Sequence, residues 1–498
     1  MRLNFLLTVL FLSAFFNSEI YAACPAPGTG IVVNGTTATE SGCTITTAGT
    51  PGLQANLAGT INFSNGSITT TGGAAYGAYA NGAGSTINLN NVSIQTTNAY
   101  GLFLNSGQIN FNTGSILTTG ASTNNGAHLL GTNSLLTLDN VNVQVNGTTG
   151  VGLFVQLGGN TVSASNCTIT TTANGSRGVD VGLGAGAASS ASLNNCTINV
   201  TTGGSSFGAV VARNGSTVAV QDCMINTDVY GVHSIAGGAS ITVDNSTINL
   251  NASIAVFGAY AQNDTTVTLQ NNTSVTTTGG NNAHGFVIQD GSTGNLFDSS
   301  IQTSGTNARG ILMQGFSSGN QANISNSTVS TSGTGARTIE MFANAGITNT
   351  LQAADATFSA TNADLILISG GIANINFNTV SAQAAASRRL LFVNGSNPAT
   401  LNWTADSSNL AGNMQVATGN TGNVTLDNSI WTGAALDVTN LTVNSSDWNL
   451  TANSTITNQL INNGLIDFVS EGNIFKTLSV SGPYIGQGGT IGLNTLLT

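Results

Sequence analysis

Charged side chains are scarce in this sequence. Only 5% of the 498 residues are charged, and Lys476 is the single lysine. The net charge of −11 and the shortage of Lys and Arg exclude a nucleic-acid-binding surface, which needs basic residues clustered along the phosphate backbone. A disordered chain of this polarity would carry high charge density and few β-branched residues. With 40% hydrophobic residues, rich in Ile, Val, Leu and Ala, the chain can instead bury a sizeable core.

Catalytic and metal-binding patterns are also missing. The sequence has no Asp-Asp pair, no Gly-His-Gly and no Arg-x-Lys, although β-helical enzymes acting on acidic polysaccharides need paired carboxylates or a bound cation with a basic group. It also lacks Gly-Asp-Ser-Gly, His-Glu-x-x-His and calcium-binding glycine-aspartate repeats. His128, His233 and His284 are too far apart to share a metal, and we expect them to be solvated at the surface. We therefore expect no catalytic residue, no metal site and no cofactor.

A long hydrophobic run occurs only at the N-terminus. Arg2 precedes a 14-residue apolar segment at 3–16, and small residues follow at Ala22 and its neighbour. This order is typical of a secretory signal peptide, and the segment is shorter than the ~20 residues that span a bilayer. We expect residues 1–22 to be removed during export; a membrane anchor and a lipoprotein-type site at Cys24 are the alternatives.

Only five cysteines are present, and they form two groups. Cys24 and Cys43 lie 19 residues apart, and export places them in an oxidising compartment. We expect them to form a disulfide that fastens the first coil. The other three, Cys167, Cys196 and Cys223, occupy one position of a repeat. Buried small hydrophobic residues are the simplest interpretation, and a disulfide between adjacent coils is the alternative.

The abundant residues, 63 glycines with many Asn, Thr and Ser, are arranged in that repeat. One segment alternates apolar and polar residues around Asn or Asp, as in LNNVSIQTT (89–97) and LNNCTINVT (193–201). A second is apolar and follows a recurring glycine, as in YGLFL (100–104) and FGAYA (257–261). Such a repeat cannot bury its apolar face alone, but stacked repeats bury a continuous core, and the period is too short for propeller blades. We predict an all-β, right-handed, single-stranded parallel β-helix, a pectin-lyase-like solenoid of roughly 18 coils.

Alternation within the repeat predicts which positions face inward. In 193–200, Leu193, Cys196, Ile198 and Val200 should face the core. The residue before Cys196 should lie at a tight turn, because Asn tolerates left-handed backbone angles. The predicted interior ladder is Val92, Val141, Cys167, Cys196, Cys223, Ser246, Thr273, Ser299 and Ser327, and the predicted turn column is Asn91, Asn140, Asn166, Asn195, Asp222, Asn245, Asn272, Asp298 and Asn326.

One outward pattern is a candidate binding surface. The position before the recurring glycine, and the outward position three residues later, hold aromatic residues and arginines, which anchor many interfaces. We expect a ribbon that binds an unidentified protein or glycan of a host-cell or bacterial surface; the alternative is that the rings stack for packing and the arginines cap turn carbonyls. The ribbon comprises Tyr76, Tyr79, Tyr100, Phe103, Arg177, Phe207, Tyr230, Tyr260, Arg309 and Arg337.

From about residue 400 the pattern changes, and all three tryptophans lie beyond this point. SSDWNLTANSTITNQL (445–460) leads into NNGLIDF (462–468) and FKTLSVSGPYIGQGGTIGLNTLL (475–497). This order resembles the junction of autotransporter passengers of the pertactin and diffuse-adherence adhesin type, where it opens the autochaperone region. The residues that carry the resemblance are Trp448, Phe475, Tyr484, Gly488, Gly489 and Asn494.

The resemblance implies export through the periplasm and display at the cell surface, the outer membrane or the extracellular space. It also implies a partner, the translocator barrel, which is missing from this chain; we expect the chain to stop partway through the autochaperone. The expected divisions are a signal peptide (1–22), an N-terminal cap with the first coils (23–60), the repetitive passenger (61–399), C-terminal coils with tryptophan (400–474) and the start of the junction (475–498).

The expected function is that of a non-enzymatic adhesin or interaction protein. Two alternatives are a β-helical enzyme acting on polysaccharides and a structural spacer without a ligand. Aromatic residues on an outward column favour binding over spacing, and the absence of an acidic cluster with a basic group disfavours the enzyme.

Overall fold

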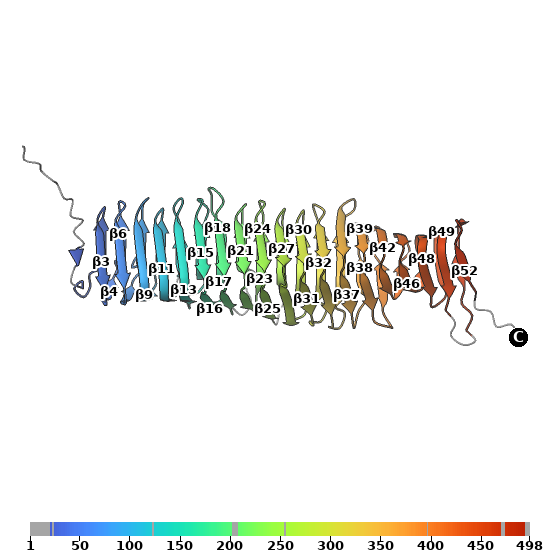
Figure 1. The fold of residues 1–498 in the computed structure, drawn as a ribbon, viewed down its shortest axis with the longest axis horizontal. Helices are drawn as coiled ribbons and strands as arrows, with labels where there is room; N and C mark the ends of the chain where they lie inside the picture. The colour runs from blue at the N-terminus through green and yellow to red at the C-terminus, as the bar shows by residue number, and fades with distance from the viewer. Residues whose placement is uncertain are drawn as a thin grey trace, which may run out of the picture.

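The computed structural model describes residues 20–21, 24–121, 124–201, 208–252, 255–395, 397–469 and 474–493. The chain forms an all-β parallel solenoid of about 17 turns, and the described part contains no helix. Figure 1 shows a straight rod in which the strands lie across the long axis, with β3 near one end and β52 near the other. The predicted parallel β-helix is confirmed, with a turn count close to the expected number. Apart from Ile20–Tyr21, the expected signal peptide lies outside the described residues.

Each turn places one strand on each of three faces. In a representative turn, β23 (Tyr230–Ile235) lies on the first face, β24 (Ser240–Asp244) on the second and β25 (Thr247–Ala252) on the third. Each strand pairs in parallel with its counterpart in the next turn, as Val232 does with Ala259. The first-face strands are β2 (Ile31–Asn34), β5 (Leu53–Asn56), β8 (Ala78–Asn81), β10 (Leu102–Asn105), β12 (Ala127–Leu129), β14 (Val151–Gln156), β17 (Arg177–Leu183), β20 (Gly208–Arg213), β23, β26 (Phe257–Gln262), β29 (His284–Gln289), β32 (Arg309–Gly315), β35 (Arg337–Ala343), β38 (Ile366–Ile368), β41 (Arg389–Val393), β44 (Asn413–Val416) and β47 (Ala435–Leu436).

The second and third faces belong to one continuous sheet. Five long strands run across both faces: β9 (Thr86–Thr97), β11 (Gln108–Thr119), β13 (Leu135–Val145), β48 (Val438–Leu450) and β49 (Ser454–Phe468). The separate second-face strands are β3 (Thr37–Ser41), β6 (Thr60–Ser64), β15 (Thr161–Ser165), β18 (Ser190–Asn194), β21 (Thr217–Gln221), β24, β27 (Thr266–Gln270), β30 (Thr293–Phe297), β33 (Gln321–Ser325), β36 (Thr348–Ala354), β39 (Gly371–Asn378), β42 (Ala399–Asp406) and β45 (Thr421–Asp427). Those of the third face are β4 (Thr44–Ala48), β7 (Ser67–Thr71), β16 (Thr168–Thr171), β19 (Thr197–Val200), β22 (Met224–Thr227), β25, β28 (Ser274–Gly279), β31 (Ser300–Thr303), β34 (Thr328–Thr331), β37 (Thr357–Ala360), β40 (Ser381–Ala384), β43 (Asn409–Ala411) and β46 (Ile430–Gly433).

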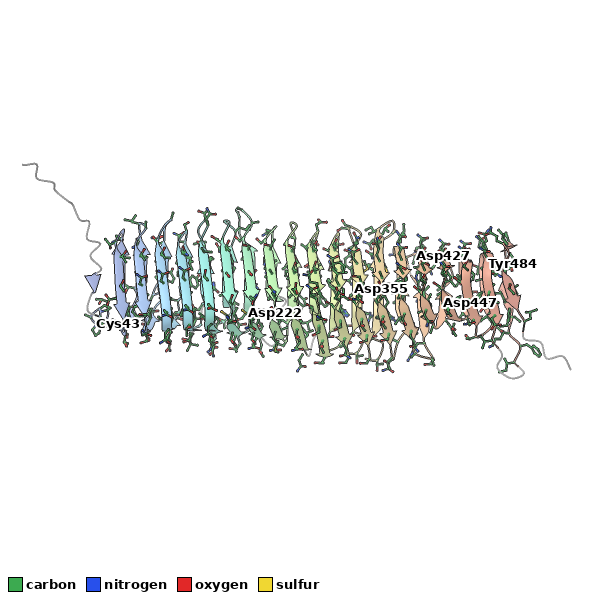
Figure 2. The ribbon with its side chains drawn as sticks, viewed as in Figure 1. Cys43, Asp222, Asp355, Asp427, Asp447 and Tyr484 are labelled. Carbon is green, nitrogen blue, oxygen red and sulfur yellow. A yellow bond between two sulfur atoms is a disulfide. The ribbon has the colours of Figure 1, made fainter. Side chains whose placement is uncertain are left out.

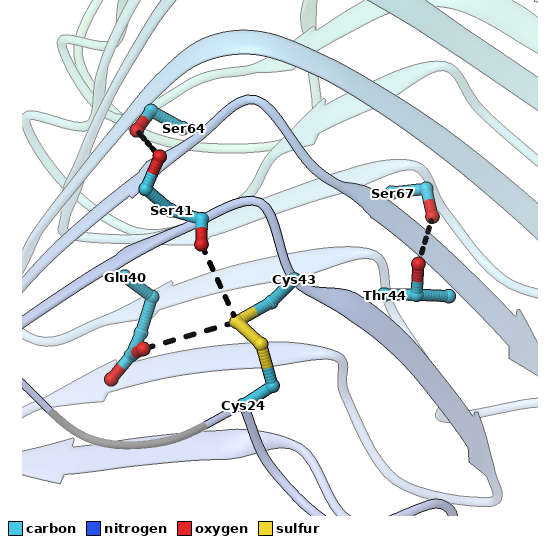
Figure 3. Close-up of a disulfide and its surroundings, with 7 residues drawn as sticks. All are labelled: Cys24, Glu40, Ser41, Cys43, Thr44, Ser64 and Ser67. Carbon is cyan, nitrogen blue, oxygen red and sulfur yellow. Dashed lines mark hydrogen bonds between the residues drawn. A yellow bond between two sulfur atoms is a disulfide. The ribbon is translucent and has the colours of Figure 1, made fainter.

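The two ends of the rod are built differently. At the N-terminal end, β1 (Ile20–Tyr21) pairs with β3, and a disulfide joins Cys24 to Cys43, with the Cα atoms 5.3 Å apart (Figure 3). At the other end, β50 (Leu478–Val480), β51 (Tyr484–Gly486) and β52 (Thr490–Gly492) all pair with β49. The disulfide therefore ties the incoming chain to the first turn, as the sequence had led us to expect.

One hydrophobic core runs through the rod. Every second residue of each strand points inward, so that each turn adds a layer of Ile, Val, Leu and Ala side chains. In the last turns Trp431 and Trp448 are wholly buried and stack, with ring centroids 5.0 Å apart. Their indole N–H groups donate to the carbonyls of Gly412 and Gly433, both at 2.9 Å, which satisfies the polar atom of each ring.

The turn between the second and third faces follows the sequence prediction. The nine residues of the predicted turn column all have positive φ, from 43° at Asn245 to 64° at Asn272. Asp222, which is labelled in Figure 2, occupies this column between β21 and β22. The predicted interior ladder is buried throughout, and its three cysteines are free thiols.

The recurring glycine lies where the first face meets the third. A Cβ at Gly101 would be 2.2 Å from Cγ2 of Ile116 and 2.6 Å from the carbonyl oxygen of Gly126. No real Cβ tolerates contacts this short, so only glycine fits. In the turn that contains 150–152, this corner is occupied by Gly152, where a Cβ would be 2.4 Å from Ile169 Cγ2.

Asparagine side chains on the outward surface connect successive turns. On the first face, Asn56 Nδ2 donates to Asn34 Oδ1 at 3.0 Å, Asn81 to Asn56 at 3.1 Å and Asn105 to Asn81 at 3.0 Å. We call these four residues the first-face asparagine ladder. Each bond joins side chains of adjacent turns, so the ladder supplements the backbone pairing of the strands.

Candidate binding face

The ribbon predicted from the sequence lies on the outward side of the first face, in two neighbouring columns. The first column is the position before the corner glycine, and the second is the outward position three residues later. The second column is much less exposed than expected: Phe103 is 8% and Tyr260 is 7% exposed. The side chains of the first column and of adjacent turns cover it. Phe207, also assigned to the ribbon, lies outside the described residues.

The aromatic side chains form two separate groups. We call the first the N-terminal ring cluster; its members come from consecutive turns at β8, β10, β12 and β14. Tyr76 stacks on Tyr100 with ring centroids 5.6 Å apart, and Tyr79 stacks on Phe103 at 5.1 Å. The cluster consists of Tyr76, Tyr79, Tyr100, Phe103, His128 and Phe154.

The second group, the central ring cluster, comes from β23, β26 and β29. Tyr230 stacks on Phe257 with centroids 4.8 Å apart, and Phe257 stacks on His284 at 5.3 Å. In the second column His233 stacks on Tyr260 at 4.4 Å. The central ring cluster therefore comprises these five residues, and Tyr260 also packs against Val287 and Leu312 in a small apolar group outside the main core.

The three histidines are buried, which corrects the expectation that they are solvated. His128, His233 and His284 are only 7%, 4% and 8% exposed, because aromatic rings from adjacent turns cover them. Burial lowers the pKa of His128 and of His233 to about 4, and of His284 to about 3. All three rings are thus neutral at pH 7, and neither nitrogen of His128 has a hydrogen-bond partner in the described part of the chain.

The arginines of the ribbon are engaged in ion pairs with carboxylates. Asp180, which is 0% exposed, accepts from Arg177 Nη1 at 2.6 Å and from Arg213 Nε at 2.9 Å. Arg309 and Arg337 likewise share the carboxylate of Glu340. These guanidinium groups are therefore fixed within the first face, which favours the interpretation that they stabilise the fold.

Two members of the face were missed in the sequence. Phe154 joins the N-terminal ring cluster through His128, with centroids 4.8 Å apart. It lies three residues after Val151, the same spacing that separates Phe103 from Tyr100, so it could have been found once Gly152 was recognised as the corner glycine. Arg213 gave no such signal, since it reaches Asp180 from a different turn.

The residues that carry the family resemblance lie in the last turns. Trp448 is in the core, whereas Phe475 and Tyr484 are exposed at 78% and 44%. Gly488 has φ of +92°, and a Cβ at Gly489 would be 2.6 Å from side-chain atoms of Asn462. Asn494 lies outside the described residues. The structure thus brings Tyr484 and Gly489 together around the Asn462 side chain, whose Nδ2 donates to Tyr484 Oη at 3.3 Å.

The described residues contain no group of three or more His, Cys, Asp or Glu side chains that could hold a metal ion. Among the described residues there is also no helix of the length and hydrophobicity needed to cross a membrane.

No protein-family model matches the chain, and no curated protein matches it either.

Proposed function

We propose that this chain is an exported, non-enzymatic binding protein, an adhesin of the autotransporter passenger kind, which holds a component of a host-cell or bacterial surface on its first face. The observation that supports this most directly is the row of half-buried tyrosines on that face. Aromatic rings that are partly exposed in rigid positions bind partners at low entropic cost and often anchor interfaces.

The chemistry of the first face does not favour an enzyme. Asp180 between Arg177 and Arg213 is the arrangement that most resembles an acidic group with basic neighbours. Its carboxylate is wholly buried, so a polysaccharide cannot reach it. A general acid or base must come within hydrogen-bond distance of the reacting atom.

Export through a pore suits this chain. The N-terminal segment 3–16 has the features of a signal peptide, and charged residues make up only 5% of the sequence. In a solenoid each turn contacts only its neighbours, so folding can propagate from one end as the chain emerges. Fractionation of expressing cells and N-terminal sequencing of the mature protein test this part of the proposal. A product that keeps residues 1–22 and stays in the cytoplasm would contradict it.

Binding is tested with the purified full chain on cultured epithelial cells and on bacterial cells. We expect saturable binding to one of them, and loss of this binding in the variant Tyr76→Ser/Tyr100→Ser. Tyr260, although it belongs to the predicted ribbon, is left intact because it is buried and its hydroxyl donates to Gln289 Oε1 at 2.5 Å.

The matched control changes three hydroxyl side chains on the third face, as Ser67→Ala/Ser93→Ala/Ser115→Ala. This variant should bind like the unchanged protein, since these residues lie away from the tyrosines. A full chain that binds neither kind of cell would leave the structural spacer as the better interpretation.

A further inference from the structure

We infer that the N-terminal ring cluster is the part of the first face that contacts ligand, and that its ligand is an uncharged, linear glycan lying along the rod. This inference rests on the proposed binding function and specifies its ligand class.

The two ring clusters differ in how well their polar atoms are satisfied. In the central ring cluster, Tyr260 Oη is bonded to Gln289, and His233 Nε2 lies 3.2 Å from Gln262 Oε1. His284 Nδ1 accepts from the backbone N–H of Arg309 at 3.0 Å. These contacts satisfy the Tyr260 hydroxyl and one nitrogen of each histidine inside the protein, whereas His233 Nδ1 is buried without a partner in the described part of the chain.

The N-terminal ring cluster lacks such contacts. Within the described part of the chain, the hydroxyl groups of Tyr76, Tyr79 and Tyr100 have no hydrogen-bond partner, and all three side chains are only half-buried. The ring faces are largely occupied by one another, so the cluster offers ring edges and phenolic hydroxyl groups. A hydroxyl-bearing ligand can donate to and accept from these groups.

Side-chain amide groups of asparagines lie next to the second ring column of the cluster. Asn81 follows Tyr79 by two residues on β8, and Asn105 follows Phe103 by two on β10, so the first-face asparagine ladder lies beside the second ring column. Aromatic rings flanked by carboxamides combine apolar contact with paired donors and acceptors. Sugar rings present the same combination of C–H surface and hydroxyl groups.

This part of the rod carries a single charged residue, which lies away from the rings. Asp139 is the single charged residue between Glu40 and Arg177 in the sequence, and its carboxylate accepts from Asn166 Nδ2 in the turn between the other two faces. His128, the titratable imidazole of the cluster, is neutral at pH 7. A sialylated or sulfated glycan would find no cation here, whereas a neutral glycan needs none.

The spacing of the rings also fits a linear chain. The ring centroids of adjacent turns are 5.6 Å apart for Tyr76 and Tyr100 and 5.1 Å apart for Tyr79 and Phe103, which is close to the advance per residue of an extended β-linked glycan. One sugar per turn would therefore meet similar surroundings at the two turns that carry Tyr76 with Asn81 and Tyr100 with Asn105. The inference requires no movement of the backbone.

Calorimetry with the full chain tests this, with cellohexaose, chitohexaose and β-1,4-linked mannohexaose as neutral probes and a heparin hexasaccharide as the anionic one. We expect at least one neutral probe to bind, with an affinity that changes less than about twofold between about 0.05 M and about 0.5 M NaCl, because no charge is involved. The heparin fragment should not bind.

Two matched variants localise the site. Tyr76→Ser/Tyr100→Ser should weaken binding at least about tenfold, the size expected when anchoring aromatics are truncated. Tyr230→Ser/Phe257→Ser, which makes the comparable change in the central ring cluster, should stay within about twofold. Tyr76→Phe/Tyr100→Phe keeps the rings and removes only the hydroxyls, and it should also weaken binding, so the result does not depend on whether the serine variant folds.

Several outcomes would overturn the inference. The first is that heparin binds in preference to every neutral probe, and the second is that no neutral probe binds. The third is that both serine variants lose the same amount of binding affinity. If the full chain still binds cells in these cases, the proposed function stands and only its ligand is wrong. If it binds neither cells nor sugars, both proposals fail.

Discussion

The Sγ atom of Cys223 accepts a hydrogen bond from the backbone N–H of Cys196 at 3.2 Å. One turn later, Ser246 Oγ accepts from the backbone N–H of Cys223 at 2.9 Å. Each of these side chains also donates to a carbonyl two residues earlier in the chain, Cys223 to Gln221 and Ser246 to Asp244. The thiol of Cys223 therefore makes the same two kinds of hydrogen bond inside the apolar core as the hydroxyl of Ser246 does.

The first prediction concerns the interior ladder. Cys223→Ser should change the stability little, because a hydroxyl can make both hydrogen bonds of the thiol. Cys223→Val should destabilise the protein by about 1–3 kcal/mol, since the buried N–H of Cys196 loses its acceptor. Urea denaturation of the two variants provides the comparison. Equal stability of Cys223→Val and Cys223→Ser would mean that the thiol acts only as a small hydrophobe.

The second prediction concerns the buried carboxylate on the first face. Asp180→Asn removes the charge that holds Arg177 and Arg213. Breaking a buried pair leaves an uncompensated charge, and we expect a loss of about 3–5 kcal/mol in thermal or urea unfolding. The control is Asp222→Asn in the turn column, where Asn195 occupies the same position one turn earlier and where we expect less than about 0.5 kcal/mol. A similar loss of unfolding free energy in both variants would show that the ion pairs of Asp180 do not stabilise the fold.

The third prediction is that acidification lowers the stability of the protein through its buried histidines. The folded-state pKa values of His128 and His233 are about 4, below the value near 6.5 of an unfolded chain. The unfolded chain therefore binds more protons between pH 6.5 and pH 4, and stability should fall as pH falls through this window. From pH 7 to pH 5 the loss should reach up to about 2 kcal/mol for each histidine.

Hydrogen exchange at pH 7 and pH 5, corrected for intrinsic rates, measures this effect locally. Protection should fall most in β12, β23 and β29, which carry the histidines. His128→Phe preserves a ring between Phe103 and Phe154 and should remove the pH dependence of β12 alone. If β12 of this variant still loses protection on acidification, the histidine is not its cause.

The fourth prediction concerns the corner glycine. Gly101→Ala places a methyl group 2.2 Å from Ile116 Cγ2, so the corner must open, and overpacking of this kind costs about 1–3 kcal/mol. Gly73→Ala is the control, because a Cβ there has nothing nearer than 4.0 Å. The melting temperatures of the two variants decide the matter, and a Gly101→Ala protein as stable as Gly73→Ala would refute the steric explanation.

Much of the fold could be predicted from the sequence because its rules are local. Alternation places Leu193 and Cys196 inside, and Asn195 adopts the left-handed backbone that its side chain favours. Both properties depend on neighbouring residues in the chain. Because the repeat shows each position many times, a departure in one turn does not obscure the pattern. Such local information is enough to specify a solenoid, in which every turn has the same surroundings.

The surroundings of the candidate site could not be predicted in this way. Alternation correctly placed His128 outside the core, but its burial depends on Tyr100 and Phe154, which come from the turns before and after. Arg213 lies 33 residues from Asp180 in the sequence and beside it in space. Contacts between outward side chains of adjacent turns decide which columns are exposed, and the spacing of residues along one turn carries no information about them.

The asparagine ladders make the two ends of the rod chemically inequivalent. On the first face each Nδ2 donates toward the N-terminal end, and Asn88 and Asn110 on the second face do the same. The amide dipoles therefore align head to tail, and aligned hydrogen bonds strengthen one another. The ladders therefore present amide carbonyl oxygens toward the C-terminal end of the rod and amide N–H groups toward the N-terminal end, so each turn is a template with a fixed polarity for the turn that is added to it.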